Sequence, residues 1–234
     1  MGVIEKSPGA KTVPGNHTNK NKTAKTKENM QISAIKSIEN TLKNAIQITY
    51  RWQDAVKDGG FTDEDSNAVI ESLFKDPIWH EGFDRGTVNE NELLSHYIKT
   101  NPCYEDLYRW FFSHPELLPV RRDRVYEYLP RLREKGYRLY ILSDYSEFLS
   151  EIHFSFGGFR KYFDGEIISY RVHAVKPEHE IYRCLLDTYM LNPEECIFLD
   201  DKEANIAGAN ACGIDGIVIT SEDKLIEVLE SFLL

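Results

Sequence analysis

The sequence lacks any long apolar run. Nothing in its 234 residues approaches the roughly 20 consecutive apolar residues that a membrane-spanning helix needs. The opening segment MGVIEKSPGAKTV also lacks the apolar core of a secretory signal peptide. The four cysteines form no Cys-x-x-Cys pair and have no histidine at zinc-finger spacing. We therefore expect a cytoplasmic protein with free thiols, no membrane partner and no structural zinc.

Positive charge is scarce outside one segment. The formal net charge is −10, yet residues 1–29 hold six lysines against two glutamates, a net charge of +4, which leaves −14 on residues 30–234. An acidic body does not offer the basic face that nucleic-acid phosphates require, so nucleic acid is excluded as a partner. The basic tail could touch an acidic partner, but such tails are usually solvated and bind nothing.

The chain divides into four segments by composition and periodicity. Residues 1–29 are rich in Lys, Asn, Thr, Gly and Pro, which predicts a disordered basic tail. Residues 30–51 form a helix, with apolar residues three and four apart over 30–48, and a lead-in to the core. Residues 52–118 read as helices joined by loops, including a loop over residues 77–86, and show no strand pattern. Residues 119–234 alternate short apolar runs with helical stretches, which is typical of an α/β core with parallel strands.

Polar side chains follow the predicted strands, where ligands bind in parallel sheets. The run YIL ends in Ser143-Asp144, whose hydroxyl and backbone N–H groups could hold a phosphate oxygen or merely cap the next helix. Lys176 precedes Pro177, which we expect at the first position of a helix. The lysine could neutralise phosphate charge or simply be solvated. For each segment taken alone, the simpler interpretation is the better one: a helix cap for Ser143-Asp144 and a solvated side chain for Lys176.

A third cluster follows the apolar run CIFL, where Asp200 and Asp201 stand side by side. Two adjacent carboxylates at the end of a buried strand repel each other unless a cation or hydrogen-bond donors lie between them. Hard oxygen ligands suit Mg²⁺, which keeps several waters and bridges to phosphate. The alternative is an aspartate helix cap with a solvated neighbour, but the pair favours a metal site.

The order and spacing of these clusters resemble the haloacid dehalogenase-like hydrolase superfamily. The segments that carry the resemblance are LREKGYRLYILSDYS, HAVKPEHEIYRCLL and CIFLDDKEANIAGANACGI, and the segment DPIWHEGFDRGTVNENELL resembles the helical cap of its small-metabolite phosphatases. The resemblance covers about residues 50–220. It implies a Rossmann-like parallel sheet core with a helical cap insertion.

The resemblance also implies roles for individual residues. Ser143 would bind the transferring phosphoryl group with help from Asp144, and Lys176 would stabilise negative charge on nucleophile and phosphate. Mg²⁺ would be the cofactor. Its implied ligands and supporting residue are Asp200, Asp201 and Asn205. The cap residues expected to influence substrate choice are Trp79, His80 and Phe83, with Trp79 counted among the substrate-binding residues.

The family's first motif, an apolar strand ending in a nucleophilic aspartate, has no counterpart. No aspartate occurs between Met1 and Trp52, and the nearest carboxylate, Glu39, lies in a helical pattern. We therefore expect the N-terminal strand of the sheet to be missing. Two explanations stay open: the first 45 or so residues are not the native start, or the chain is a non-catalytic relative in which the helix over 30–48 covers the gap.

The sequence thus predicts the lineage of a Mg²⁺-dependent phosphatase of small phosphorylated metabolites, such as sugar phosphates. An intact parent would work through an aspartyl-phosphate, whereas this chain would have little or no turnover. One alternative is a pseudo-enzyme that binds phosphate and Mg²⁺ without turnover. Another is carbon–halogen hydrolysis, which needs the same missing aspartate but no metal. The oligomeric state is not predicted.

Overall fold

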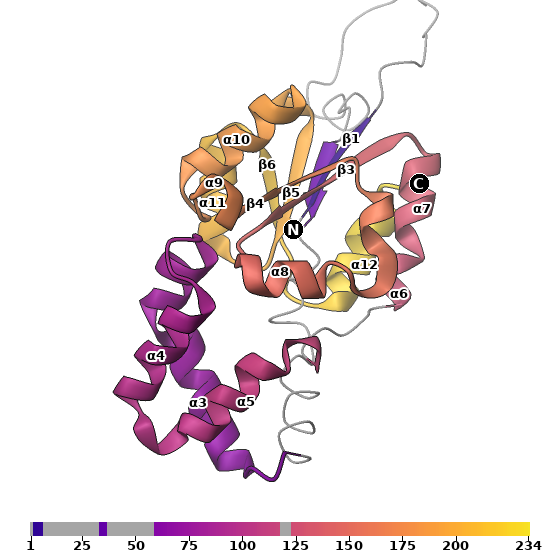
Figure 1. Ribbon diagram of the computed structural model, residues 1–234. Helices are drawn as coiled ribbons and strands as arrows, with labels where there is room; N and C mark the ends of the chain where they lie inside the picture. Colours follow the sequence, from indigo (N-terminus) through magenta and orange to yellow (C-terminus); the bar gives the residue numbers. More distant parts are fainter. Residues whose placement is uncertain (1, 7–32, 37–58, 118–122) are drawn as a thin grey trace, which may run out of the picture.

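One six-stranded sheet forms the centre of the core (Figure 1). The computed structural model describes residues 2–6, 33–36, 59–117 and 123–234. Within these residues the strands are β1 (Gly2–Lys6), β2 (Ser33–Lys36), β3 (Tyr137–Ser143), β4 (Gly165–Ile168), β5 (Cys196–Asp200) and β6 (Asp215–Val218). The order across the sheet is β4-β3-β1-β2-β5-β6, and all described pairings are parallel except those of β1. The expected α/β core with a parallel sheet is confirmed.

The centre of the sheet corrects the expectation of a missing strand. β2 pairs in parallel with both β3 and β5, and β1 runs antiparallel beside it. Residues 2–6 therefore form a strand inside the expected tail, and residues 33–36 form a strand inside the expected helix. The remainder of both segments lies outside the described residues. A four-residue strand in the middle of a sheet is held by its neighbours, so local periodicity is a poor guide to it.

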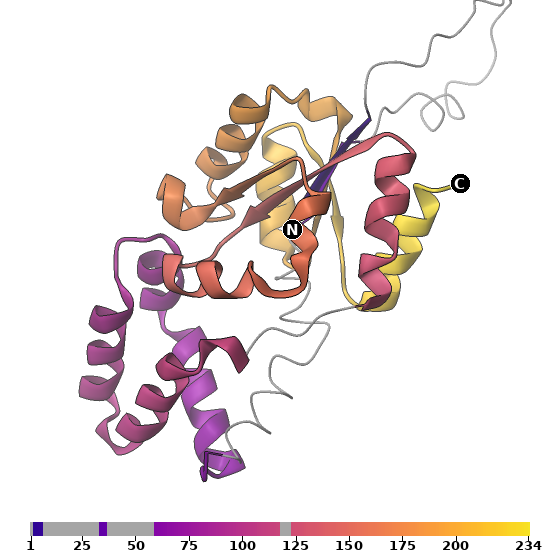
Figure 2. The same ribbon diagram turned by 45° about the vertical axis from the view of Figure 1, so that its right-hand side comes forward.

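Alternate residues of the central strands face opposite layers of helices, as the two-residue period of a strand requires. In β3, Leu139 and Ile141 belong to one buried cluster, and Tyr140 and Leu142 belong to the other. The first cluster includes side chains of α7 and α12, and the second includes side chains of α10 and α11. Figures 1 and 2 show these helices on either side of the sheet. The carboxyl ends of β3 and β5 are thereby fixed between two packed layers.

The core helices follow the predicted alternation with strands. They are α6 (Asp123–Tyr126), α7 (Tyr128–Glu134), α8 (Glu147–His153), α9 (Ser169–Val172), α10 (His179–Tyr189), α11 (Glu203–Ala211) and α12 (Glu222–Ser231). Pro177 was expected at the first position of its helix, but α10 begins two residues later with Glu178 as its N-cap. The core also contains short 3₁₀ turns η4 (Phe156–Tyr162) and η5 (Pro193–Glu195).

All regular elements within the described residues 59–117 are helical, and this segment, the expected cap, is called the cap below. Its elements are α3 (Asp63–Lys75), η1 (Ile78–Asp84), α4 (Glu90–Thr100), η2 (Pro102–Tyr104), α5 (Glu105–Ser113) and η3 (Pro115–Leu117). Thr62 is the N-cap residue of α3, because its hydroxyl accepts from the Asp65 amide at 3.1 Å. Where a loop was expected over residues 77–86, η1 forms a π-helix. Helical turns of this type often occur at functional sites.

Aromatic rings fill the interior of the cap. The Trp79 ring lies 5.2 Å from that of Phe83 and 4.9 Å from that of Phe74, and the residue is only 4% exposed. Trp79 was expected among the substrate-binding residues, but the structure places it in the cap core. Within the part of the chain that the structure describes, every helix is too short or too polar to cross a lipid bilayer.

Candidate active site

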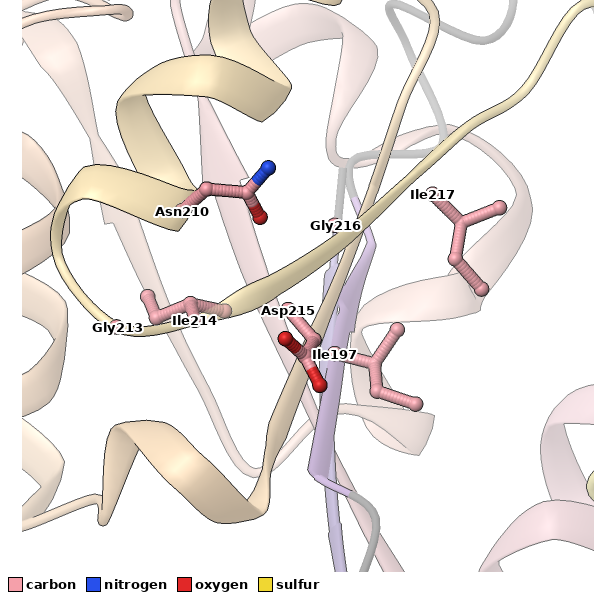
Figure 3. A pocket seen from close by; sticks show the side chains of 7 residues that line it. All are labelled: Ile197, Asn210, Gly213, Ile214, Asp215, Gly216 and Ile217. Carbon is pink, nitrogen blue, oxygen red and sulfur yellow. The ribbon is translucent and has the colours of Figure 1, made fainter. Parts of the chain in front are cut away.

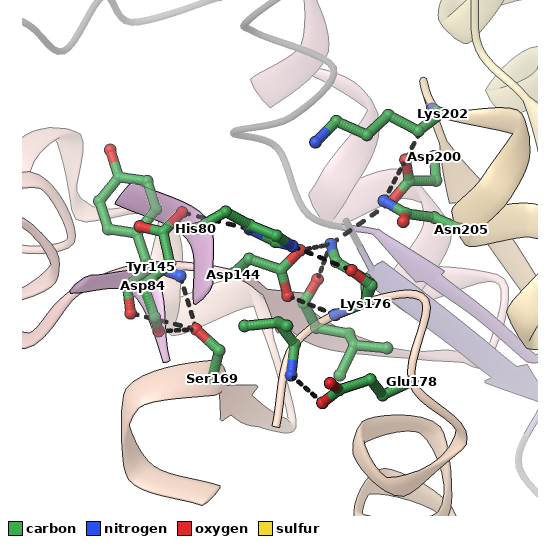
Figure 4. A network of polar contacts seen from close by, with 12 residues as sticks. His80, Asp84, Asp144, Tyr145, Ser169, Lys176, Glu178, Asp200, Lys202 and Asn205 are labelled. Atoms are coloured by element: carbon green, nitrogen blue, oxygen red, sulfur yellow. Dashed lines mark hydrogen bonds and ion pairs between the residues drawn. The ribbon is translucent and has the colours of Figure 1, made fainter. Parts of the chain in front are cut away.

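The ammonium of Lys176 lies at the centre of a buried polar cluster at the carboxyl ends of β3 and β5 (Figure 4). Its Nζ donates to the Leu142 carbonyl at 3.1 Å and lies 3.4 Å from Asp200 Oδ2. Asp144 Oδ2 is 3.9 Å away. Lys176 is 1% exposed and Asp200 is fully buried. A charge removed from water to this degree requires such partners, so the cluster is an electrostatic unit.

The Ser143-Asp144 segment joins the same cluster. Ser143 is the last residue of β3, beside the carbonyl that Lys176 contacts, and its side chain is fully buried. Asp144 Oδ1 accepts from the Lys176 backbone N–H at 2.9 Å. The structure therefore brings together Ser143, Asp144 and Lys176, which the sequence separates by more than thirty residues.

Asp200 is held in place by donors from the start of α11. Asn205 Nδ2 lies 3.0 Å from both Asp200 carboxylate oxygens, and the Lys202 amide donates to Asp200 Oδ1 at 2.8 Å. Asn205 is 2% exposed. Asn205 thus contacts Asp200, the first residue of the aspartate pair, on the side of Asp200 away from the cap (Figure 4).

The pKa of Asp201 reflects its burial and the adjacent carboxylate of Asp200. Burial, followed by the charge of Asp200, raises the pKa of Asp201 to about 6. A divalent cation between the two carboxylates would relieve this repulsion. The described residues contain no group of three or more His, Cys, Asp or Glu side chains that could hold a metal. Mg²⁺ nevertheless fits this donor set, because it commonly uses one or two carboxylates and completes its shell with water.

We expect Asp201→Asn to stabilise the metal-free protein at pH 8. The pKa of Asp201 is higher in the folded than in the unfolded chain, so ionisation opposes folding as pH rises through that interval. Discounted for solvent screening, the gain in unfolding free energy should be about 1–2 kcal/mol at pH 8 and fall to about 0.3 kcal/mol near pH 4, just above the pKa of an unfolded aspartate. Urea unfolding at both pH values measures it, with the exposed Asp187→Asn as control. An equal effect at both pH values would contradict the assignment.

The cap contributes His80 and Asp84 to the surroundings of Lys176. The sequence predicted His80 only as a cap residue that influences substrate choice, and it did not predict Asp84. His80 Nε2 lies 3.1 Å from the Lys176 carbonyl oxygen, and His80 Nδ1 lies 3.5 Å from Asp84 Oδ2. The hydrogen bond with Asp84 raises the pKa of His80, against the opposing effect of burial. The four-residue spacing of His and Asp was the available signal. It was missed because residues 77–86 read as a loop.

A second polar contact joins the cap to the segment that follows Asp144. The Tyr145 hydroxyl lies 2.5 Å from His153 Nδ1, and His153 Nε2 lies 2.8 Å from the Pro115 carbonyl oxygen. A carbonyl can only accept, so Nε2 carries the proton and Tyr145 donates to Nδ1. Burial lowers the pKa of His153, which keeps the ring neutral in this arrangement.

Two cavities lie near these elements. One of about 200 Å³ lies between cap residues 83–92 and core residues 146–148, at the start of α8. The other, of about 500 Å³, is lined by Ile197, Asn210, Gly213, Ile214, Asp215, Gly216 and Ile217 (Figure 3). Its wall includes the first residues of β5 and β6, whereas Asp200 ends β5. It therefore lies away from the candidate site.

Several known proteins are similar to this chain. It is 35% identical over 71 residues to bifunctional epoxide hydrolase 2 of Sus scrofa and 37% identical over 70 residues to that of Mus musculus. Each match spans 30% of this chain but only 13% of the relative. These relatives are therefore much longer than the region they share with this chain.

Solved structures share the fold over most of the chain. An HAD-like family hydrolase from Porphyromonas gingivalis is 22% identical with a TM-score of 0.59, over 70% of this chain and 82% of that one. The HAD family enzyme BT-2542 of Bacteroides thetaiotaomicron, as a variant in complex with magnesium and inorganic phosphate, is 23% identical with a TM-score of 0.53, over 72% and 85%. A dehalogenase is 15% identical with a TM-score of 0.53, over 76% and 81%.

The family match spans the cap and the whole polar cluster. The model of the haloacid dehalogenase-like hydrolases matches residues 34–213, from β2 through α11. Ser143, Lys176, Asp200 and Asn205 all lie inside the matched region and meet at one end of the sheet. With this extent of match and this fold, the chain belongs to the haloacid dehalogenase-like hydrolases.

Proposed function

We propose that the chain carries the Mg²⁺-dependent phosphate site of a phosphatase that acted on small phosphorylated metabolites, with turnover lost or very low. The observation that carries the proposal is the convergence of Ser143, Lys176 and Asp200 at one end of the sheet. An ammonium and a buried carboxylate beside a hydroxyl suit a phosphate bound together with a divalent cation. The similar fold of BT-2542, which binds magnesium and inorganic phosphate, supports this ligand class.

Each residue has a chemical role in that site. Ser143 and the backbone of Asp144 would bind the phosphoryl oxygens, and Lys176 would offset their charge. Asp200 and Asp201 would hold Mg²⁺ directly or through water, and Asn205 would orient Asp200, as its two 3.0 Å contacts already do. The ion would supply positive charge against the phosphate. A small phosphorylated metabolite, such as a sugar phosphate, is the proposed partner.

The proposed loss of turnover is based on the lack of a suitable carboxylate in the sequence of β2. Covalent phosphoryl transfer needs a carboxylate aimed in line at phosphorus. β2 lies between β3 and β5, but its sequence SAIK has no carboxylate, and the first aspartate of the chain is Asp54. Glu39, the nearest carboxylate in the sequence, lies outside the described residues. Because carbon–halogen hydrolysis needs the same aspartate and gives Asp200-Asp201 no task, it remains the weaker alternative.

Phosphate release tests the catalytic half of the proposal. We expect no inorganic phosphate above background from sugar phosphates or p-nitrophenyl phosphate in the presence of Mg²⁺. Robust turnover that Asp201→Ala abolishes would contradict the proposal and reveal another nucleophile. Release that survives Asp201→Ala would indicate a contaminating phosphatase.

Thermal denaturation tests the binding half. Phosphate or a phosphate analogue should raise the melting temperature only when Mg²⁺ is present. At a ligand concentration 100 times Kd the stabilisation should be about 2.7 kcal/mol. The absence of any Mg²⁺-dependent shift would exclude the phosphate site, including its non-catalytic form.

A further inference from the structure

The segment that carries Lys176 is a loop that bonds to side chains of the cap and has no regular secondary structure of its own. It comprises residues 173–178, the lysine loop, and connects α9 to α10. His173 has a left-handed backbone with φ of 53°, and Glu178 N–H donates to the Val175 carbonyl at 2.9 Å. The Val175 N–H donates to the Glu178 side chain of the same loop, whereas the Lys176 N–H and carbonyl bond to Asp144 and His80, which lie outside it. The position of the lysine therefore depends on those side chains.

The cap meets this loop through residues 80–86, the cap turn. Arg85 donates to both carboxylate oxygens of Glu178, at 2.9 and 2.7 Å, and to the His173 carbonyl at 3.1 Å. His173 Nδ1 lies 3.1 Å from the Arg85 carbonyl oxygen. The fork-to-fork geometry of Arg85 and Glu178 is the strongest form of a charge-assisted hydrogen bond. It raises the pKa of Arg85 and lowers that of Glu178.

Glu178 connects Arg85 to the backbone next to Lys176. Its Oε2, which accepts from Arg85, also accepts from the Val175 N–H at 3.0 Å. The next residue, Lys176, is held by Asp144 at its N–H and by His80 at its carbonyl. Figure 4 shows these groups surrounding Lys176 from the cap side and from the end of β3. A shift of the cap turn would therefore move the backbone from which the ammonium extends.

Gly86 provides an independent sign that the cap turn is seated closely on the core. Its φ is +77°, and a Cβ atom there would lie 2.8 Å from the Tyr170 carbonyl oxygen. Only glycine accepts both the conformation and this approach without strain. Ser169, the residue before Tyr170, donates to the Asp84 carbonyl and accepts from the Tyr145 N–H at 2.9 Å. The cap turn thus contacts the lysine loop directly and is linked through Ser169 to Tyr145, the residue after Asp144.

We propose that Arg85 and Glu178 are positioning residues. Through them, the position of the cap on the core determines where the Lys176 ammonium lies and so sets the affinity of the site for phosphate. This proposal rests on the proposed function, because phosphate is its ligand. Neither residue needs to touch phosphate. The position of the cap would then control the charge that holds the phosphoryl group, and a displaced cap would weaken phosphate binding without altering the aspartate pair.

Calorimetric titration of the full chain with inorganic phosphate in saturating Mg²⁺ provides the test. Arg85→Gln and Glu178→Gln should each weaken phosphate binding about tenfold, as the loss of one charge-assisted pair predicts. The affinity for Mg²⁺ alone should stay within about twofold. Arg109→Gln, which removes an exposed cap ion pair with Glu105, is the matched control and should change neither affinity.

The double variant with both Arg85→Gln and Glu178→Gln distinguishes a single shared effect of the Arg85–Glu178 pair, called the clamp, from two independent effects. If the two residues act only through each other, the double variant should bind phosphate as weakly as the weaker single variant, whereas independent effects would multiply to about a hundredfold loss. Multiplicative losses, or unchanged phosphate affinity in both single variants, would overturn the proposal. A loss of Mg²⁺ affinity equal to that of phosphate would also overturn it, because that result indicates general disruption of the site.

Hydrogen exchange keeps the proposal testable if the wild-type chain binds no phosphate at all, in which case the proposed function fails. The amides of Val175 and Lys176 donate to Glu178 and Asp144. Both should exchange about tenfold faster in Glu178→Gln and Arg85→Gln, as expected when a local opening becomes easier, but not in Arg109→Gln. Unchanged exchange at these two amides would refute the clamp independently of any ligand.

Discussion

Replacing Lys176 by methionine should destabilise the protein by about 3–5 kcal/mol and abolish phosphate binding. The ammonium is 1% exposed and lies 3.4 Å from Asp200 and 3.9 Å from Asp144. Methionine fills a similar volume, so packing is largely kept while two buried carboxylates lose their cation. A stranded buried charge costs far more than the net contribution of the pair that it leaves. Urea unfolding in the absence of Mg²⁺ measures the loss.

The exposed neighbour Lys202 gives the matched control, because Lys202→Met removes the same charge from the surface and should cost less than about 0.5 kcal/mol. Adding Asp200→Asn to Lys176→Met should recover at least half of the lost stability, since the amide needs no counter-charge. If the single Lys176→Met variant is as stable as the wild type, the polar cluster does not depend on its cation.

Asp144→Asn should raise the affinity for phosphate about tenfold in the presence of Mg²⁺. Asp144 is 3% exposed, follows Ser143 directly, and shares the Lys176 ammonium with Asp200. If about 6 Å separated the Asp144 carboxylate from a bound phosphate, one unit charge on each would repel the other by about 3 kcal/mol at an effective dielectric of about 20. Screening by solvent and Mg²⁺ reduces this to an expected gain of about 1.4 kcal/mol. Asparagine retains the oxygen that accepts from the Lys176 N–H, so the loop should keep its position.

Titration calorimetry with inorganic phosphate measures this gain, and the exposed carboxylate at Glu147 supplies the control. Glu147→Gln removes a charge three residues further along, at the start of α8, and should change the affinity less than twofold. Weaker phosphate binding in Asp144→Asn would mean that the carboxylate assists the site, for instance by orienting Lys176. The prediction rests on the proposed function.

The sequence sufficed to predict the residues at the strand ends. Ser143 and Asp200 end apolar strands, and parallel topology brings such ends together at one edge of a sheet. Lys176 precedes a helix and lies 3.4 Å from Asp200, although no strand leads into it. This prediction required no knowledge of side-chain packing. The convergence that it anticipated is confirmed by the contacts of Lys176 with Leu142 and Asp200.

The cap contribution could not be predicted in the same way. Trp79 and His80 are adjacent, yet Trp79 packs in the cap core and His80 contacts the Lys176 carbonyl. Which of the two reaches the core depends on the π-helical winding of η1, whose five-residue hydrogen-bond spacing has no simple apolar period. Strand β2 escaped prediction for a related reason, because Ile35 fits a helical period locally while the strand that contains it pairs with β3 and β5.

Two groups of polar contacts among the described residues attach the cap to the core and restrict how it can move. One joins the cap turn to the lysine loop and to Ser169, and the other joins the Pro115 carbonyl to His153. A rigid body held at two points keeps a single rotational freedom, about the line that joins them. The cavity of about 200 Å³ between cap residues 83–92 and the start of α8 is bordered by both bodies. A swing about that axis would change the width of this cavity while both attachments stay intact.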